Sequence, residues 1–248
     1  MNRFFWIFLS LAFPLLIFAE EKRIYEIEVG QFDKIKILDN VNVVYRCLPD
    51  STGMAFYESE EELDNPFLLT SNGKGLVKIQ VSSDYVGKPN LPTLFVYSDF
   101  LTSVENSSDA TITIEHTQPC AEFKATQVGN GSINVHSLNA TNVSAKLNTG
   151  NGTITLDGEC QKAVFNLVGS GLIAADRLQA DNIDCKFVGS GSIGCWAIES
   201  INIKGIGSTK IYYKGQPNIK KTGGGKVFRL PESNSARLSD SPTDSNDE

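Results

Sequence analysis

The sequence predicts an all-β protein, a parallel β-helix or solenoid with irregular coils at its N-terminal end. Three observations predict it. A glycine phrase returns after 21, 19 and 20 residues, apolar residues alternate with polar ones after each copy, and helical stretches between the copies are lacking. A period near 20 residues is typical of repeat architectures. The connections are too long for hairpins and too short for crossover helices, so the coils wind in one direction and pair in parallel.

The repeated glycine motif combines a turn at a corner of the coil with the start of a short strand. Its clear copies begin at Gly129, Gly150, Gly169 and Gly189, and each continues through Asn or Ser, a second glycine, any residue and an isoleucine. Glycine adopts positive φ without a Cβ clash and lets neighbouring backbones approach closely. The residues assigned to these turns are Gly129, Gly131, Gly150, Gly152, Gly169, Gly171, Gly189 and Gly191.

Apolar residues at fixed distances from each corner predict the core. They are Ile133 and Val135, Ile154 and Leu156, Ile173 and Ala175, and Ile193 and Cys195. Because side chains alternate across a strand, both members of each pair face the interior. A second alternating run later in each coil predicts another inward-facing strand. One coil buries too little apolar area to offset the backbone entropy that it loses on folding, so the coils must stack on one another. Neighbouring strands of a sheet lie about 4.8 Å apart, which sets the expected spacing of the coils.

The sequence before the repeats also shows patterns typical of short strands. Residues 24–47 predict two or three strands, and residues 54–65 a strand followed by a helical turn or an acidic loop. A hairpin is expected over 68–81, with its turn at 72–75, and a further strand over 94–97. We interpret this part as irregular coils or a cap, because terminal repeats must shield an open edge.

Both ends predict segments outside the solenoid, which we place at residues 20–230. Residues 1–19 hold Arg3, an uncharged apolar run and Ala19, which predicts a secretory signal peptide. A single-pass anchor is the rival reading, but it needs about 20 apolar residues. Residues 231–248, rich in Ser, Asp and Pro, predict a disordered acidic tail. The expected location is the periplasm, the outer membrane surface or the exterior, with no membrane span left after cleavage.

Charge and cysteine usage exclude several classes of protein. With 22 basic and 29 acidic residues the net charge is −7, which disfavours nucleic-acid binding. The five cysteines, none in a C-x-x-C motif, are expected to be buried free thiols: Cys185 and Cys195 in inward columns, Cys120 and Cys160 two coils apart and beyond disulfide reach. With two histidines and no Cys-His cluster, we expect no metal and no cofactor.

Motifs along the chain resemble the bacterial head GIN domain family of autotransporter adhesins over about residues 30 to 230. They are F-D-x-I-x-I at Phe32, V-x-V-x-Y at Val41, L-x-x-I at Leu76, the glycine series, Y-x-G-x-P-x-I at Tyr213 and G-G-G-K-V at Gly223. The resemblance implies a right-handed parallel β-helix exported by bacteria, and it brings no catalytic or binding residues. Asn106 to Ala110 depart from the pattern, because the first glycine corner is replaced there.

One outward column carries the candidate ligand-binding residues. The positions seven residues after each first glycine hold His136, Asp157 and Asp176 on consecutive coils, flanked by Trp196. The indole face and the acids could bind a sugar, although a solvated outer face is the plainer interpretation. No arginine or lysine is expected near these acids in the manner of β-helix polysaccharide lyases.

Two functional hypotheses follow. The first is an exported cell-envelope protein without catalytic activity, an adhesin or ligand-binding module whose partner is a cell-surface glycan or an envelope protein. The alternative is a carbohydrate-active enzyme, a polysaccharide lyase or glycoside hydrolase, on the same scaffold, since a fold does not fix a function. A purely structural spacer is a third possibility.

Overall fold

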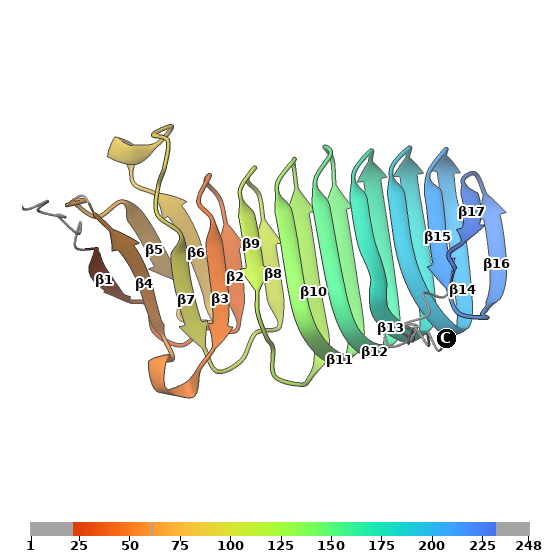
Figure 1. The fold of residues 1–248 in the computed structure, drawn as a ribbon, viewed down its shortest axis with the longest axis horizontal. Helices are drawn as coiled ribbons and strands as arrows, with labels where there is room; N and C mark the ends of the chain where they lie inside the picture. The colour runs from red at the N-terminus through yellow and green to blue at the C-terminus, as the bar shows by residue number, and fades with distance from the viewer. Residues whose placement is uncertain (1–21, 61, 232–248) are drawn as a thin grey trace, which may run out of the picture.

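The computed structural model describes residues 22–60 and 62–231. In these ranges the chain forms a β-solenoid whose turns stack along one long axis (Figure 1), so the predicted all-β, parallel β-helix fold is confirmed. The predicted signal peptide and almost all of the predicted tail lie outside the described residues and stay predictions. Over the described ranges, no helix has the length and apolarity needed to cross a bilayer.

Four long strands each make most of one turn. They are β11 (Ser132–Asn148), β12 (Thr153–Gly169), β13 (Leu172–Gly189) and β14 (Ser192–Gly207). Each pairs with the next in parallel, both before and after a bend, so equivalent residues of successive turns lie side by side. The bend divides every turn between two faces.

We call the two stacks of strands face 1 and face 2. Face 1 contains β7 (Leu94–Ser98), β3 (Val43–Cys47), β9 (Thr111–Ile114), the first halves of β11 to β14, β15 (Lys210–Lys214) and β17 (Lys226–Arg229). Face 2 contains β6 (Leu76–Val81), β2 (Lys34–Ile37), β8 (Ser103–Asn106), β10 (Cys120–Val128), the second halves of β11 to β14 and β16 (Asn218–Gly223).

Two opposite edges connect these faces. The repeated glycine corners lead from face 2 to face 1 along what we call the glycine edge, the upper edge in Figure 1. A short segment of each turn leads from face 1 back to face 2, and we call this the short side. It comprises residues 138–140, 158–160, 178–180 and 196–197, which pair in register from turn to turn.

The N-terminal turns do not stack in chain order. β2 and β3 lie between the turn made by β6 and β7 and the turn made by β8 and β9. Lys34 therefore pairs with both Leu76 and Ser103, and Val43 with both Leu94 and Ile112. The irregular N-terminal coils that we expected are thus strands paired across long stretches of sequence.

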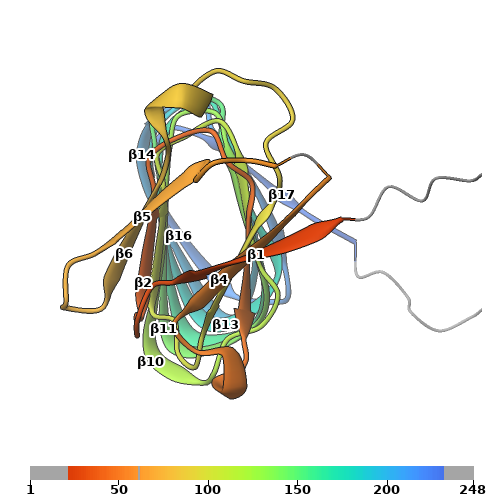
Figure 2. The same ribbon diagram turned by 90° about the vertical axis from the view of Figure 1, so that its left-hand side faces the viewer.

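Antiparallel strands cover the N-terminal end of the stack (Figure 2). β1 (Arg23–Glu28) pairs with β4 (Met54–Ser59), β4 also meets β7, and β5 (Phe67–Ser71) forms the predicted hairpin with β6. Tyr25 and Tyr57 stack with ring centroids 4.8 Å apart. The 3-10 helices η1 (Pro49–Ser51) and η2 (Ser83–Tyr85) complete the described elements. These strands end the parallel ladder and shield its edge, as a cap must.

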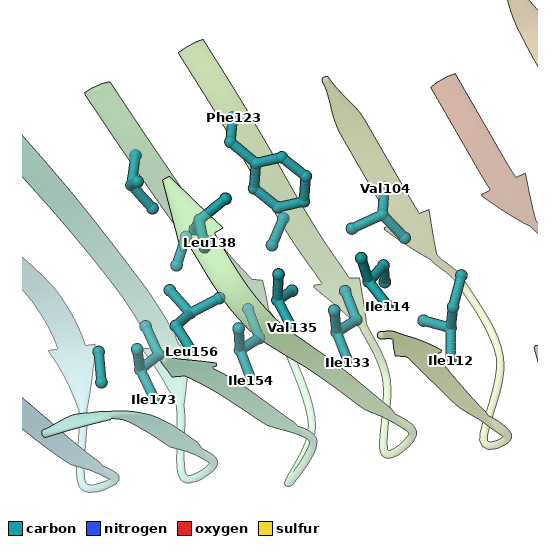
Figure 3. Close-up of a cluster of buried hydrophobic side chains, with 14 of the residues drawn as sticks. Val104, Ile112, Ile114, Phe123, Ile133, Val135, Leu138, Ile154, Leu156 and Ile173 are labelled. Atoms are coloured by element: carbon teal, nitrogen blue, oxygen red, sulfur yellow. The ribbon is translucent and has the colours of Figure 1, made fainter. Parts of the chain in front are cut away.

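The core consists of columns that run through the stack (Figure 3). Ile112, Ile133, Ile154, Ile173, Ile193 and Ile211 occupy equivalent positions of successive turns, and each is fully buried. Phe123, Phe165 and Phe187 fill the other half of the interior, and they too are buried. A side chain in this interior contacts the turns on both sides of its own, so the turns stabilise one another.

All five cysteines are free, but only two are fully buried. Cys185 and Cys195 lie in the interior, as predicted, whereas Cys47, Cys120 and Cys160 are half-buried. Cys120 and Cys160 are separated by Ala140 in the same column, two turns apart. The expectation of buried thiols is therefore wrong for these three, which lie at the end of β3 or on the short side and are partly exposed.

Candidate functional site

The predicted outward column begins where the chain leaves face 1. His136 Nδ1 lies 2.8 Å from Asp157 Oδ2, and the backbone N–H of Ser137 donates to Asp157 Oδ1 at 2.8 Å. The bend in β11 is one residue longer than the bend in β12, and Ser137 adopts a φ of +52° there. The carboxylate of Asp157 thus holds the wider bend of the preceding turn.

Opposing effects act on the pKa of Asp157. Burial of the carboxyl raises this pKa, whereas the N–H of Ser137, the imidazole of His136 and the charge of Arg177 at 3.8 Å lower it. The lowering prevails, so the pKa of Asp157 lies below its ordinary value of 3.8. A general acid needs a pKa near the working pH. Asp157 is therefore suited to hold a charge and unsuited to donate a proton.

Replacing Asp157 by asparagine is expected to lower the free energy of unfolding by about 1 kcal/mol at neutral pH, because the charge-assisted bonds to His136 and Ser137 are lost. The folded-state pKa is depressed, so wild-type protein keeps this contribution above about pH 4 and loses it as the pH falls through the folded-state value. Urea unfolding at neutral pH and at about pH 3 measures the difference. The exposed Asp50→Asn serves as control, and an equal effect of Asp157→Asn at both pH values would contradict the prediction.

Asp176 makes its contacts with a lysine two turns away. Lys214 Nζ donates to the backbone carbonyl of Asp176 at 2.8 Å and lies 3.1 Å from its Oδ2. The turn between them carries Gly194, whose missing side chain leaves room beside the Asp176 carboxyl. With Arg177 beside Asp157, this contact makes the expectation of no nearby arginine or lysine wrong. Both acids are held in ion pairs.

The predicted outward column is not continuous, because Asp157 pairs in register with Arg177 and not with Asp176, and Trp196 belongs to a different column. It pairs in register with Gln179, because β14 has three residues fewer than β13 between the paired positions 175/195 and 179/196. Counting residues from the glycine corner therefore misplaces it. The structure joins His136 with Asp157 and Asp176 with Lys214, and it places Trp196 on the short side.

The column that contains Trp196 is a polar ladder on the short side. Asn139, Glu159, Gln179 and Trp196 pair in register on successive turns. The first three are exposed, Trp196 is half-buried, and Asn139 Nδ2 donates to Glu159 Oε1 at 3.3 Å. We call these four residues the short-side ladder. Three of these residues, Asn139, Glu159 and Gln179, were not predicted as site residues from the sequence, although they recur at intervals of 20 residues.

Two open depressions adjoin this ladder. The larger, about 590 Å³, is lined by Glu159, Gln161, Gln179 and Asp181 among others. The smaller, about 400 Å³, includes His116, Leu138 and Trp196. Both depressions are lined by Pro119, Asn139, Glu159 and Gln179, so they adjoin along the ladder, and we call the two together the short-side groove.

Cys120, Ala140 and Cys160 form an apolar strip beside the ladder, in the larger depression. Burial raises the pKa of the Cys160 thiol to about 12, with a smaller contribution from the charge of Asp181, and burial also raises the pKa of Cys120. The thiolate is the nucleophile and the metal ligand. At neutral pH both groups are therefore uncharged thiols that offer apolar surface.

The chemistry of the groove favours a neutral, hydroxyl-rich ligand. Its lining holds carboxylates and amides, and neither depression is lined by a lysine or arginine. An anionic ligand would meet Glu159 and Asp181 without a compensating cation. Among the described residues, no group of three or more His, Cys, Asp or Glu side chains could hold a metal ion.

Solved structures with the same fold support this architecture. A putative adhesin from Bacteroides fragilis has a TM-score of 0.74 at 22% identity, over 86% of this chain and 98% of the other. A putative lipid binding protein from Parabacteroides distasonis has a TM-score of 0.63 at 20% identity, with the same coverage. A putative adhesin from Parabacteroides merdae has a TM-score of 0.62 at 18% identity, again over 86% and 98%. At these identities the likeness shows the fold alone.

Sequence comparison identifies the family directly. No curated protein matches the chain. Residues 31–217 match the family described as "Putative auto-transporter adhesin, head GIN domain", which covers most of the span over which the sequence motifs resemble that family. The chain therefore belongs to the head GIN domain family.

Proposed function

We propose that the protein is an exported adhesion module of the bacterial cell envelope, without catalytic activity, that binds a neutral glycan in the short-side groove. The observation that carries the proposal is the short-side ladder, in which the half-buried indole of Trp196 continues a row of exposed Asn, Glu and Gln side chains. A pyranose ring has an apolar face and a rim of hydroxyls. The indole can stack on that face while amides and carboxylate bond the rim.

The stacked turns suit a polymeric ligand. Equivalent residues of neighbouring turns lie about 4.8 Å apart, so the ladder offers hydrogen-bonding groups at regular steps along the groove. A chain of sugar units could engage several steps at once, and each added contact would strengthen binding. Membership in a family of adhesins agrees with recognition of a surface polymer.

Two other functions fit the site less well. An acyl chain requires an enclosed apolar cavity, whereas this groove is open and lined by amides and acids. A glycoside hydrolase requires two carboxyl groups with divided roles. Asp157 and Asp176 are held in ion pairs, so the enzymatic alternative now depends on Glu159 and Asp181, which line the same depression.

Replacing Trp196 by alanine is expected to weaken glycan binding about tenfold or more, because a partly buried tryptophan typically carries a large share of a binding energy. A glycan array identifies the ligand, and isothermal titration then measures its affinity for wild type, Trp196→Ala and Gln179→Ala. Gln179 is exposed, so its substitution tests the groove without disturbing the core.

The control is His136→Ala, which changes the neighbouring column and leaves the short side intact. Equal weakening by His136→Ala, or unchanged binding in both groove variants, would exclude the groove as the site. Cleavage of the bound glycan that is lost in Glu159→Gln would instead establish the enzymatic alternative.

A further inference from the structure

An exposed apolar ridge runs along the glycine edge, opposite the short side. Val168, Val188 and Ile206 pair in register on three successive turns, and their exposed fractions are 42%, 55% and 74%. Leu172, 39% exposed, lies just across the corner on face 1. Single exposed apolar residues are common, but an aligned row of them usually marks an interaction surface. We call these four residues the apolar ridge.

Lysines flank the ridge on both faces. On face 2, Lys186 and Lys204 precede Val188 and Ile206 by two residues, so they project from the same side of their strands. On face 1, Lys210 and Lys226 continue the register column that passes through Leu172 and Ser192. All four lysines are exposed. We call them the flanking lysines.

The flanking lysines have no acidic partners in the structure. Within residues 22–60 and 62–231, none of the four makes an ion pair. Asp184, two residues before Lys186 on the same strand, is paired with Lys162 at 3.4 Å. The whole chain has a net charge of −7, so the stretch of the edge that holds the four lysines carries a local charge opposite to that of the protein.

We propose that the glycine edge docks on an anionic lipid bilayer, with the apolar ridge in the interfacial region and the flanking lysines at the lipid phosphates. Peripheral membrane surfaces combine an apolar strip with lysines beside it, since burial of the strip and attraction to anionic headgroups add. The ridge is straight and follows a corner, which lets one row of side chains meet a flat surface without moving the backbone. The proposal involves none of the groove residues, and it leaves the short side pointing away from the membrane.

Co-sedimentation with vesicles tests the docking. The protein is the chain without residues 1–19, whose apolar run would itself partition into lipid. The vesicles are phosphatidylcholine alone or with about one third phosphatidylglycerol. We expect binding to the anionic vesicles only, weakened by salt. Lys186→Gln with Lys204→Gln should reduce the partition coefficient about tenfold or more. Val188→Ser with Ile206→Ser should reduce it to a similar extent.

Matched controls make equivalent changes at the other end of the solenoid. Lys74→Gln with Lys78→Gln removes two exposed lysines, and Ile24→Ser with Leu68→Ser removes two exposed apolar residues, 69% and 52% exposed. Both controls should bind as wild type does.

Absence of binding to anionic vesicles, or equal loss in controls and test variants, would overturn the proposal. Binding that depends on the lysines but not on the ridge would also overturn it, since such a surface would hold any polyanion, nucleic acid included. Glycan titration of the same variants should be unchanged, which separates this test from that of the groove.

Discussion

Replacing Gly189 by alanine is expected to lower the free energy of unfolding by more than about 4 kcal/mol, a large part of the stability of a typical domain. Gly189 has a φ of +142°, where a side chain is strained, and an added Cβ would overlap the carbonyl oxygen of Gly169 in the preceding turn. That oxygen accepts a hydrogen bond from the N–H of Ser190 at 3.0 Å. The backbone at this corner therefore cannot move to accommodate a side chain without breaking hydrogen bonds between two turns.

Thermal unfolding followed by circular dichroism measures the effect, and for a domain of this size the midpoint should fall by about 10 °C or more. The control is Gly73→Ala. Gly73 also has a positive φ, +68°, but nothing lies within 4 Å of an added Cβ. Its substitution should cost only the backbone strain, about 1 kcal/mol. If both substitutions cost the same, the corner would be looser than the close approach of Gly189 and Gly169 indicates.

The inward columns could be predicted because their signal is local. Alternation with period two determines which residues of a strand face the interior, and the glycine phrase gives the same starting point in every turn. Ile133, Ile154, Ile173 and Ile193 therefore stack as expected. The prediction needed only the sequence of each strand and the rule that a single coil cannot fold alone.

The candidate site was only partly predictable, because turns that start in register do not all have the same length at their bends. Between the inward column of Val135, Leu156, Ala175 and Cys195 and the short-side ladder, the bend contributes three residues in β11, two in β12, three in β13 and none in β14. Any count from the glycine corner fails beyond this bend. Trp196 was thus assigned to the column of Asp176, whereas it continues the column of Gln179.

The stacking order of the N-terminal turns could not be predicted either. Lys34 and Ser103 are paired although 69 residues separate them, and nothing in the local pattern of either strand specifies the partner. Parallel strands with the same alternation are interchangeable until the surrounding turns fix their neighbours. The order is therefore a property of the assembled stack.

Replacing Asn106 by leucine is expected to lower the free energy of unfolding by about 3 kcal/mol, because the Asn106 amide performs the task that glycines perform at the later corners. Its Nδ2 donates to the carbonyls of Ala110 at 2.8 Å and Ser132 at 3.3 Å. Its Oδ1 accepts from the N–H of Ser108 at 3.1 Å and from the Ser108 hydroxyl at 2.7 Å. Despite the missing glycine, β8 and β9 join the stack in regular register.

Leucine is the informative substitute because Leu147 occupies the same column two turns later, where it is fully buried. A leucine at position 106 therefore suits the interior, and the loss measured by urea unfolding reports on the missing amide. Ser107→Ala, at the same corner, removes only a hydroxyl contact with Glu105 and should cost less than about 0.5 kcal/mol. A small effect of Asn106→Leu would mean that this corner closes without its amide. A large one would show that a buried asparagine can replace a glycine turn when it bonds the backbone of two successive turns.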